Sequence, residues 1–257
     1  ALLIQDPVIH LFGNRHISIN SLNLSEKLNE NGIPLMLTGS ISTYDIMDKN
    51  GFYNRKQKQP VSVEIGDDVV ANFKYIDFYF VPECHRLAFF ANQEITHSHV
   101  QSYFQRASDN ILGVDQMNVT FEISQDVIER ILNATYIDRF KAVVSYSNRD
   151  DHNLFEELLS EKAQDDNINK LEIIAIPPQG ESLTAKKDGI IEATAKLAKS
   201  NGYIHATIRD GEKGKRVSID TTEHPLKLPI STKLSMLKDE IYILLMNTFR
   251  NGNKENG

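Results

Sequence analysis

The sequence of 257 residues has little cysteine and no long apolar run. Its single cysteine, Cys84, cannot form an internal disulfide, and there is no cluster of thiols to hold zinc. No apolar stretch approaches the roughly eighteen residues that a membrane-spanning helix needs. The first residues also lack the basic region and cleavage site of a secretion signal. We therefore expect a cytoplasmic protein that is neither secreted nor inserted in a membrane.

The composition is that of a folded globular protein. Hydrophobic residues make up 40% of the chain and charged residues 25%, which excludes a disordered or collagen-like chain. The 28 basic and 35 acidic residues give a formal net charge of −7. A surface coated for non-specific binding of phosphates is not expected from this charge, although a local basic patch is compatible with it.

The first 113 residues combine apolar strands with polar loops and end in a helix. The long segment 69–81 is rich in aromatic residues and predicts a strand. Over Phe73–Phe80 it is apolar on both faces, which indicates either a covered central strand or an interface. Residues 40–60 are polar and predict an exposed loop. The expected elements are strands at 8–12, 33–37, 61–65, 69–81 and 87–90 and helices at 22–28 and 100–113.

A second alternation of strands and helices follows Gly113, so we place a domain boundary there. The expected elements are strands at 117–123, 140–146, 171–176, 203–209 and 215–219 and helices at 124–133, 150–159, 190–201 and 231–245. The predicted class is α+β, with two mixed α/β domains whose largely antiparallel sheets are covered by helices. These domains span 1–113 and 114–250, and a flexible tail follows at 251–257.

The sequence carries no complete catalytic signature. The glycines of 211–216 have the wrong spacing for a phosphate-binding loop, so this segment is interpreted as the tip of a hairpin. A carboxylate-metal nuclease needs Glu-x-Lys on a strand beside a further acidic residue, and we find no such pattern. We assign no catalytic residue, metal or cofactor, and favour a protein that is not an enzyme.

Two short segments hold the densest groups of metal-ligating or nucleophilic side chains. His97 and His99 would share one face of a strand, but two ligands leave a metal site half made. A polar loop before a helix is the simpler interpretation. Cys84 and His85 would point to opposite faces of a strand, which favours a buried structural thiol over a nucleophile with its base.

Charge is segregated along the second half of the chain. Residues 150–170 hold seven acidic residues and two lysines, whereas residues 186–216 hold eight basic residues and four acidic ones. If the helix and hairpin of the basic segment lie side by side, they form a strip that faces phosphates; a solvated surface of mixed charge is the alternative. The candidate nucleic-acid-binding residues are Lys186, Lys187, Lys196, Lys199, Arg209, Lys213, Lys215 and Arg216, which Arg55, Lys56 and Lys58 could join.

The order of elements resembles the RexA-like family of phage-exclusion proteins and its bacterial phage-defence relatives. The clearest stretch runs from Val119 to Asp138 and continues through 140–146. A second stretch covers 202–215, followed by 226–229 and a helix over 234–249. The first half is similar only in outline, through Asn50-Gly-Phe-Tyr53 and the aromatic strand up to Phe90.

The resemblance implies a two-domain, dimeric, non-enzymatic protein that binds DNA without strong sequence preference. It would act as the sensor of an abortive-infection system, with a membrane or effector protein as partner. The net charge of −7 departs from that expectation, because DNA binding needs several cations on one face.

Two other functions stay open at this point. One is a metal-dependent nuclease or another defence enzyme. Its ligands would be His97, His99 and the acidic pairs Asp67 and Asp68, Asp150 and Asp151, and Asp165 and Asp166. The other is a protein-interaction module or inhibitor whose acidic surface contacts a basic partner or imitates DNA.

Overall fold

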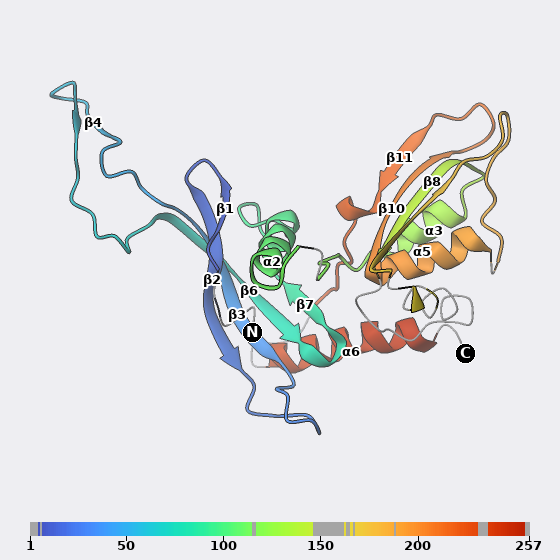
Figure 1. Ribbon diagram of the computed structural model, residues 1–257, viewed down its shortest axis with the longest axis horizontal. Coiled ribbons are helices and arrows are strands. Elements are labelled where there is room, and N and C mark those ends of the chain that lie inside the picture. The colour runs from blue at the N-terminus through green and yellow to red at the C-terminus, as the bar shows by residue number, and fades with distance from the viewer. Residues whose placement is uncertain are drawn as a thin grey trace. The chain divides into compact units, whose positions relative to one another are not determined.

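The computed structural model describes residues 5, 7–114, 117–145, 162, 165–166, 168–187, 189–230 and 236–254, with side chains up to residue 248 (Figure 1). Helices and antiparallel sheets give the expected α+β class. The chain forms two compact units. Unit 1 comprises Ala1–Val114 with Thr232–Met246, and unit 2 comprises Asp115–Ser231 with Asn247–Gly257.

Unit 1 is built on a five-stranded antiparallel sheet in the order β1-β2-β3-β6-β7. One face of the sheet is apolar and buried: Ile41 is paired with Ile76, and Phe78 is fully buried two residues farther along. Helix α2 (His97–Leu112) contributes Phe104, whose ring meets that of Phe78 edge-on at 6.4 Å. The strands are β1 (Ile9–Phe12), β2 (Arg15–Leu24), β3 (Leu37–Asp45), β6 (Ala71–Val81) and β7 (Arg86–Phe89).

The helix expected at 22–28 is wrong, because β2 continues to Leu24 and pairs with β3 along its whole length. The strand's alternation is interrupted where its register against β3 shifts between Ile19 and Ser21. An extra residue at such a bulge moves the following side chains to the other face. The spacing of the leucines after it therefore imitates a helix.

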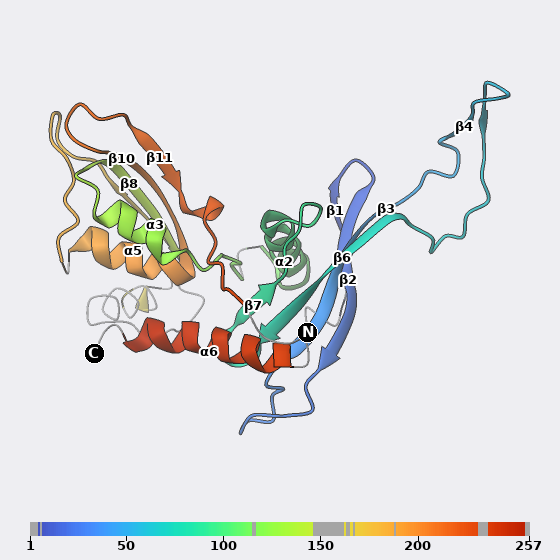
Figure 2. The same ribbon diagram turned by 180° about the vertical axis from the view of Figure 1, so that it is seen from behind.

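The exposed loop expected at 40–60 is wrong up to Asp45, where the chain is still in the largely buried strand β3, and a two-stranded ribbon lies farther along. Strand β4 (Phe52–Asn54) pairs antiparallel with β5 (Gln59–Val61), so the strand expected over 61–65 is wrong except for its first residue. The ribbon and the chain on either side of it, from residue 46 to 70, form what we call the arm. Figures 1 and 2 show it projecting beyond the end of the five-stranded sheet.

Unit 2 is built on a four-stranded antiparallel sheet in the order β11-β10-β8-β9. Strand β10 buries Ile204, Ala206 and Ile208 in alternation, and these residues form the core with Ile128 and Leu197 of the covering helices. The strands are β8 (Tyr136–Ser145), β9 (Lys170–Ala175), β10 (Gly202–Arg209) and β11 (Val217–Asp220), and the covering helices are α3 (Gln125–Leu132) and α5 (Ile190–Asn201).

Of two further elements expected in unit 2, the structure describes only the first. The strand expected at 117–123 is wrong, because only Ile123 forms a bridge, to Pro225. Its side chain packs in the helix-covered core instead. The helix expected at 150–159 falls outside the described residues.

The domain boundaries differ from the expected ones at the C-terminal end. The first unit ends at Val114, one residue beyond the expected boundary, but it also includes 232–246. Helix α6 (Leu237–Lys254) belongs to unit 1 up to Met246 and to unit 2 afterwards, and it extends four residues into the expected flexible tail. Residues 231–235, where this helix was expected to begin, lie outside the described residues. No helix in the described part of the chain is long and apolar enough to cross a bilayer.

Candidate nucleic-acid interface

Three segments of unit 2 meet at the end of the sheet where β8 begins. Strand pairing places Arg209, the last residue of β10, opposite Tyr136, the first residue of β8. Leu183 forms a bridge to Ile137, and its N–H donates to the Ile137 carbonyl at 2.9 Å. The β10–β11 hairpin tip and the segment before α5 therefore lie at this end of the sheet. We call its cations the basic end: Lys186, Lys187, Arg209, Lys213, Lys215 and Arg216.

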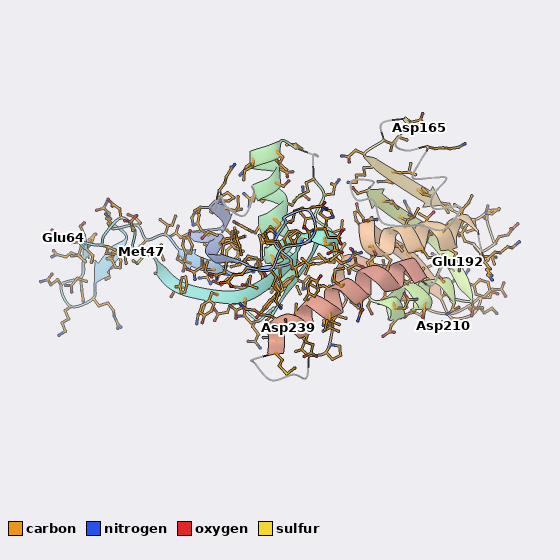
Figure 3. The ribbon with its side chains drawn as sticks, turned by 90° about the horizontal axis from the view of Figure 1, so that it is seen from below. Met47, Glu64, Asp165, Glu192, Asp210 and Asp239 are labelled. Atoms are coloured by element: carbon orange, nitrogen blue, oxygen red, sulfur yellow. The ribbon has the colours of Figure 1, made fainter. Side chains whose placement is uncertain are left out.

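Figure 3 shows the same arrangement from below. Glu192, in the first turn of α5, and Asp210, at the hairpin tip, both lie at this end of unit 2. Since α5 leads directly into β10, the helix and the strand run in opposite directions, and the start of α5 lies near the end of β10.

A single carboxylate holds the two arginines of the basic end. Asp138 accepts a hydrogen bond from Arg209 Nε at 2.8 Å on one oxygen, and from Arg216 Nε at 2.8 Å on the other. The Arg209 guanidinium also lies 4.8 Å from the centre of the Tyr136 ring and donates to the Glu212 carbonyl. Arg209 is thereby committed to the fold.

The hydrogen bonds from Arg209 lower the pKa of Asp138 below its ordinary value, with Arg216 adding to the effect and partial burial opposing it. Asp138 therefore stays ionised through the neutral range. The Arg209 and Asp138 side chains are only 16% and 12% exposed, whereas Arg216 is 73% exposed. Arg216 is thus oriented by Asp138 through Nε while its side chain remains accessible to a ligand.

The four lysines of the basic end are exposed. Lys213 and Lys215 flank Gly214, whose N–H donates to the Gly211 carbonyl at 3.0 Å in a tight turn. A Cβ added at Gly214 would lie 2.2 Å from the Asp210 carbonyl oxygen, so only glycine fits this turn. The glycines of 211–216, whose spacing does not fit a phosphate-binding loop, shape the hairpin turn that exposes these two lysines.

Lys196 and Lys199 do not belong to the basic end. Lys196 lies in the middle of α5 and pairs with Glu192 at 3.4 Å. Lys199 lies in the last turn, where its carbonyl accepts from the Ile123 N–H at 2.9 Å. A helix rises about 1.5 Å per residue, so Lys199 lies roughly 15 Å along the axis from Gly189. The eight predicted cations therefore divide into six at one end and two along the helix.

The histidines proposed as metal ligands lie in the first turn of α2 rather than on a strand. His99 Nδ1 accepts from the Thr96 N–H at 3.4 Å, which completes a capping box. Positions 97 and 99 are two residues apart, so they do not share a face of the helix. Within the described residues, no three His, Cys, Asp or Glu side chains come together as a metal site would require.

The remaining candidates form no metal site in the described part of the chain, where Asp68, Asp165 and Asp166 are exposed. Asp67 forms an ion pair with Lys49, and Asp150 and Asp151 are not among the described residues. Cys84 lies in the 3-10 turn Pro82–Cys84 and is buried, and its thiol donates to the Val81 carbonyl at 3.7 Å. Burial raises the pKa of this thiol, which keeps it protonated.

Asp138 is the residue of this site that the sequence analysis missed. A single aspartate in an apolar strand carries no signal of its own, and its partners lie 71 and 78 residues away. The hydrogen bonds depend on the register between β8 and β10, which local patterns do not reveal.

The family described as Domain of unknown function (DUF4747) matches residues 3–245 of this chain. Neither a curated protein nor a solved structure matches it. The match extends over both units, so the sheets, the arm and the basic end all lie within it.

Proposed function

Since this chain belongs to the DUF4747 family, whose description assigns no activity, we propose from its geometry that it binds duplex DNA through the basic end of unit 2. The observation that carries the proposal is the convergence of six cations from two separate segments, 186–187 and 209–216, on one end of a sheet. Five of the six have exposed side chains.

The chemistry of the basic end fits phosphates better than base edges. Lysine binds phosphate as a mobile point charge, and contacts to phosphate carry no sequence information. Arg216 is fixed at its Nε by Asp138, which orients the guanidinium before a ligand arrives and reduces the entropy lost on binding. We therefore expect affinity without strong sequence preference.

The acidic remainder of the chain sets the salt range in which binding occurs. With a net charge of −7, the protein as a whole is repelled by DNA, and the attraction is confined to a local patch. Each phosphate neutralised changes the logarithmic salt slope by about −0.9. Five exposed cations therefore predict a slope of about −4 to −5, and binding that fades above roughly 0.2 M salt.

The biological setting of the proposal is supported by the resemblance to RexA-like proteins. In that setting the protein is a cytoplasmic, non-enzymatic sensor of a bacterial antiviral system that works by abortive infection. It acts as a homodimer and passes its signal to a membrane or effector partner. DNA is the ligand through which invasion is sensed.

The proposal is tested by titrating a labelled 20-base-pair duplex with the wild-type protein and with the K213E/K215E/R216E variant. Reversal of three contacts lowers affinity by at least about 100-fold at 0.1 M salt, equally for unrelated sequences. The matched control K27E/K227E/K238E changes the net charge by the same amount at exposed lysines outside the basic end. It keeps most of the affinity.

A second variant and a cleavage assay serve as further controls in this experiment. Because Arg216 is bonded to Asp138, a second variant, K186Q/K187Q/K213Q/K215Q, leaves that pair intact and is expected to lose affinity as well. Incubating the same duplex with Mg²⁺ and inspecting it on a gel checks for cleavage. Unchanged affinity in both variants, or a cleaved duplex, contradicts the proposal.

A further inference from the structure

The arm of unit 1 is a long projection whose side chains bury almost nothing. All residues from 55 to 64 are exposed, including the apolar Val61 and Val63. In Figure 3, Met47 lies nearer the sheet and Glu64 farther out along the arm. Among the described strands, none pairs with the outer edges of β4 or β5. An isolated two-stranded ribbon is marginally stable in water, which points to a partner that it contacts.

The root of the arm is held firmly in the sheet. Asp45, the last residue of β3, accepts from Asn72 Nδ2 at 2.6 Å and forms an ion pair with Arg15 at 3.3 Å. Arg15 also donates to Thr43 Oγ1 at 2.7 Å and to the Asn72 carbonyl at 3.0 Å. These contacts join β2, β3 and β6 where the two chains of the arm leave the sheet, so the arm has a fixed point of departure.

The tip is shaped by amide side chains. Asn54 Oδ1 accepts from the N–H groups of Lys56 and Gln57, both at 3.0 Å, and closes the turn. Gln57 Oε1 accepts from Asn54 and from Gln59, each at 3.2 Å. Side chains within the turn therefore fix its shape. The neighbouring Arg55, Lys56 and Lys58 form no ion pair with a described acidic residue.

The charge of the tip is opposite to that of the protein. Residues 51–63 contain Arg55, Lys56 and Lys58 and no acidic residue, whereas the whole chain has a net charge of −7. Lysine is depleted in protein interfaces, while Arg, Lys, Asn and Gln are the side chains that contact phosphates and base edges. The composition of the tip thus matches a nucleic acid more closely than a protein surface.

We propose that the arm is a second DNA contact, and that its β4–β5 ribbon enters the major groove with Arg55, Lys56 and Lys58 on the flanking phosphates. The major groove is about 12 Å wide and admits a two-stranded ribbon. The Tyr53 side chain on the ribbon is 58% exposed, so it contributes no core packing and is free to contact DNA. This inference deepens the proposed function and rests on DNA being the ligand of the basic end.

The two contacts would reinforce each other. The arm has three exposed cations and the basic end has five, so each contact alone binds DNA weakly at physiological salt. When both contacts lie on one duplex, the second forms at a high effective concentration because the same chain carries both. An acidic protein gains useful affinity for DNA in this way.

The test compares the wild-type protein with two variants that have the same net charge as each other. R55Q/K56Q/K58Q removes the cations of the tip, and K27Q/K227Q/K238Q removes three exposed lysines outside the arm and the basic end. The tip variant is expected to bind a 20-base-pair duplex at least about tenfold more weakly at 0.1 M salt, with a slope less negative by about 2 to 3. The control keeps both values, and all three proteins unfold at the same temperature because the tip packs against nothing.

Footprinting with dimethyl sulfate identifies the groove. The reagent methylates guanine N7 in the major groove and adenine N3 in the minor groove. At saturating protein, the wild type protects N7 and the tip variant does not, while N3 reacts equally in both. Loss of affinity with unchanged N7 reactivity contradicts entry into the major groove.

The possible results distinguish the proposed role of the arm from the proposed DNA binding by the basic end. A wild type that binds DNA and a tip variant equal to the control overturn the role of the arm and leave the basic end standing. A wild type that binds no DNA overturns both. A tip variant that alters the mass of the particle in solution but not DNA binding assigns the arm to a second copy of the chain instead.

Discussion

Asp138 and Arg209 lie on neighbouring strands with a carboxylate oxygen 2.8 Å from the guanidinium Nε, and Arg216 of the same hairpin approaches the second oxygen. One partly buried carboxylate thus fixes the end of β10 and the start of β11 to β8. Of its two partners, Arg209 is largely buried and stabilises the fold, whereas Arg216 remains exposed to solvent.

Replacing this carboxylate by its amide is expected to destabilise unit 2. Asp138→Asn keeps the shape of the side chain but leaves the largely buried Arg209 without its counter-ion. Hydrogen bonds to charged groups contribute about 2 kcal/mol, and a loss of that order is expected in chemical denaturation. Arg216→Gln, at a side chain that is 73% exposed, is expected to cost much less. Equal losses for the two variants would contradict the division of roles.

The same carboxylate gives the stability a predictable dependence on pH. Because the folded-state pKa of Asp138 is lowered, its contribution is complete above the ordinary value of 3.8 and is lost as pH falls through the folded pKa. The stability difference between wild type and Asp138→Asn should be constant from pH 7 to about 5 and shrink below 3.8. Denaturation curves at several pH values measure it, and a difference that grows on acidification would contradict the assignment.

The hairpin tip provides a test that changes no charge. Gly214→Ala introduces a Cβ that would lie 2.2 Å from the Asp210 carbonyl oxygen, so the turn between Lys213 and Lys215 must rearrange. DNA affinity is expected to fall by several-fold in the same anisotropy titration. Gly13→Ala serves as the control, because it strains the turn between β1 and β2, at φ 53°, outside both the arm and the basic end.

Cys84 is expected to be inert in the folded protein. Its side chain is buried, and burial raises the pKa of the thiol. A disulfide reagent at pH 7 should therefore label it at the rate of unfolding, and immediately in denaturant. Rapid labelling of the native protein would show that the segment Pro82–Cys84 opens to solvent.

The sequence predicts those elements whose local pattern agrees with their environment. Strand β10 alternates Ile204, Ala206 and Ile208 with polar residues, and its burial follows that alternation residue by residue. Helix α3 carries Ile128 and Ile131 at a spacing that places both in the core. Both elements could be located from periodicity alone.

The missed elements are those in which tertiary structure overrides the local pattern. The register shift after Ile19 disturbs the alternation of β2, and the following leucines then imitate a helix. Ile123 is buried by a helix and a single bridge, without a strand around it. Burial by neighbours distant in sequence leaves no periodic signal.

The candidate site could be predicted in part, for the same reason. The charge counts identify the right segment, but they cannot separate Lys199, at the end of α5, from Lys213, at the hairpin tip. That separation follows from strand register and helix length. The partnership of Asp138 with two arginines requires the sheet itself.

The measurement that tests the account most directly is the salt dependence of wild-type binding to a random duplex at pH 7. The account predicts that the logarithm of the binding constant falls linearly with the logarithm of salt concentration, with a slope of about −4 or steeper. Absence of binding at 50 mM salt, or binding that salt does not weaken, would contradict it.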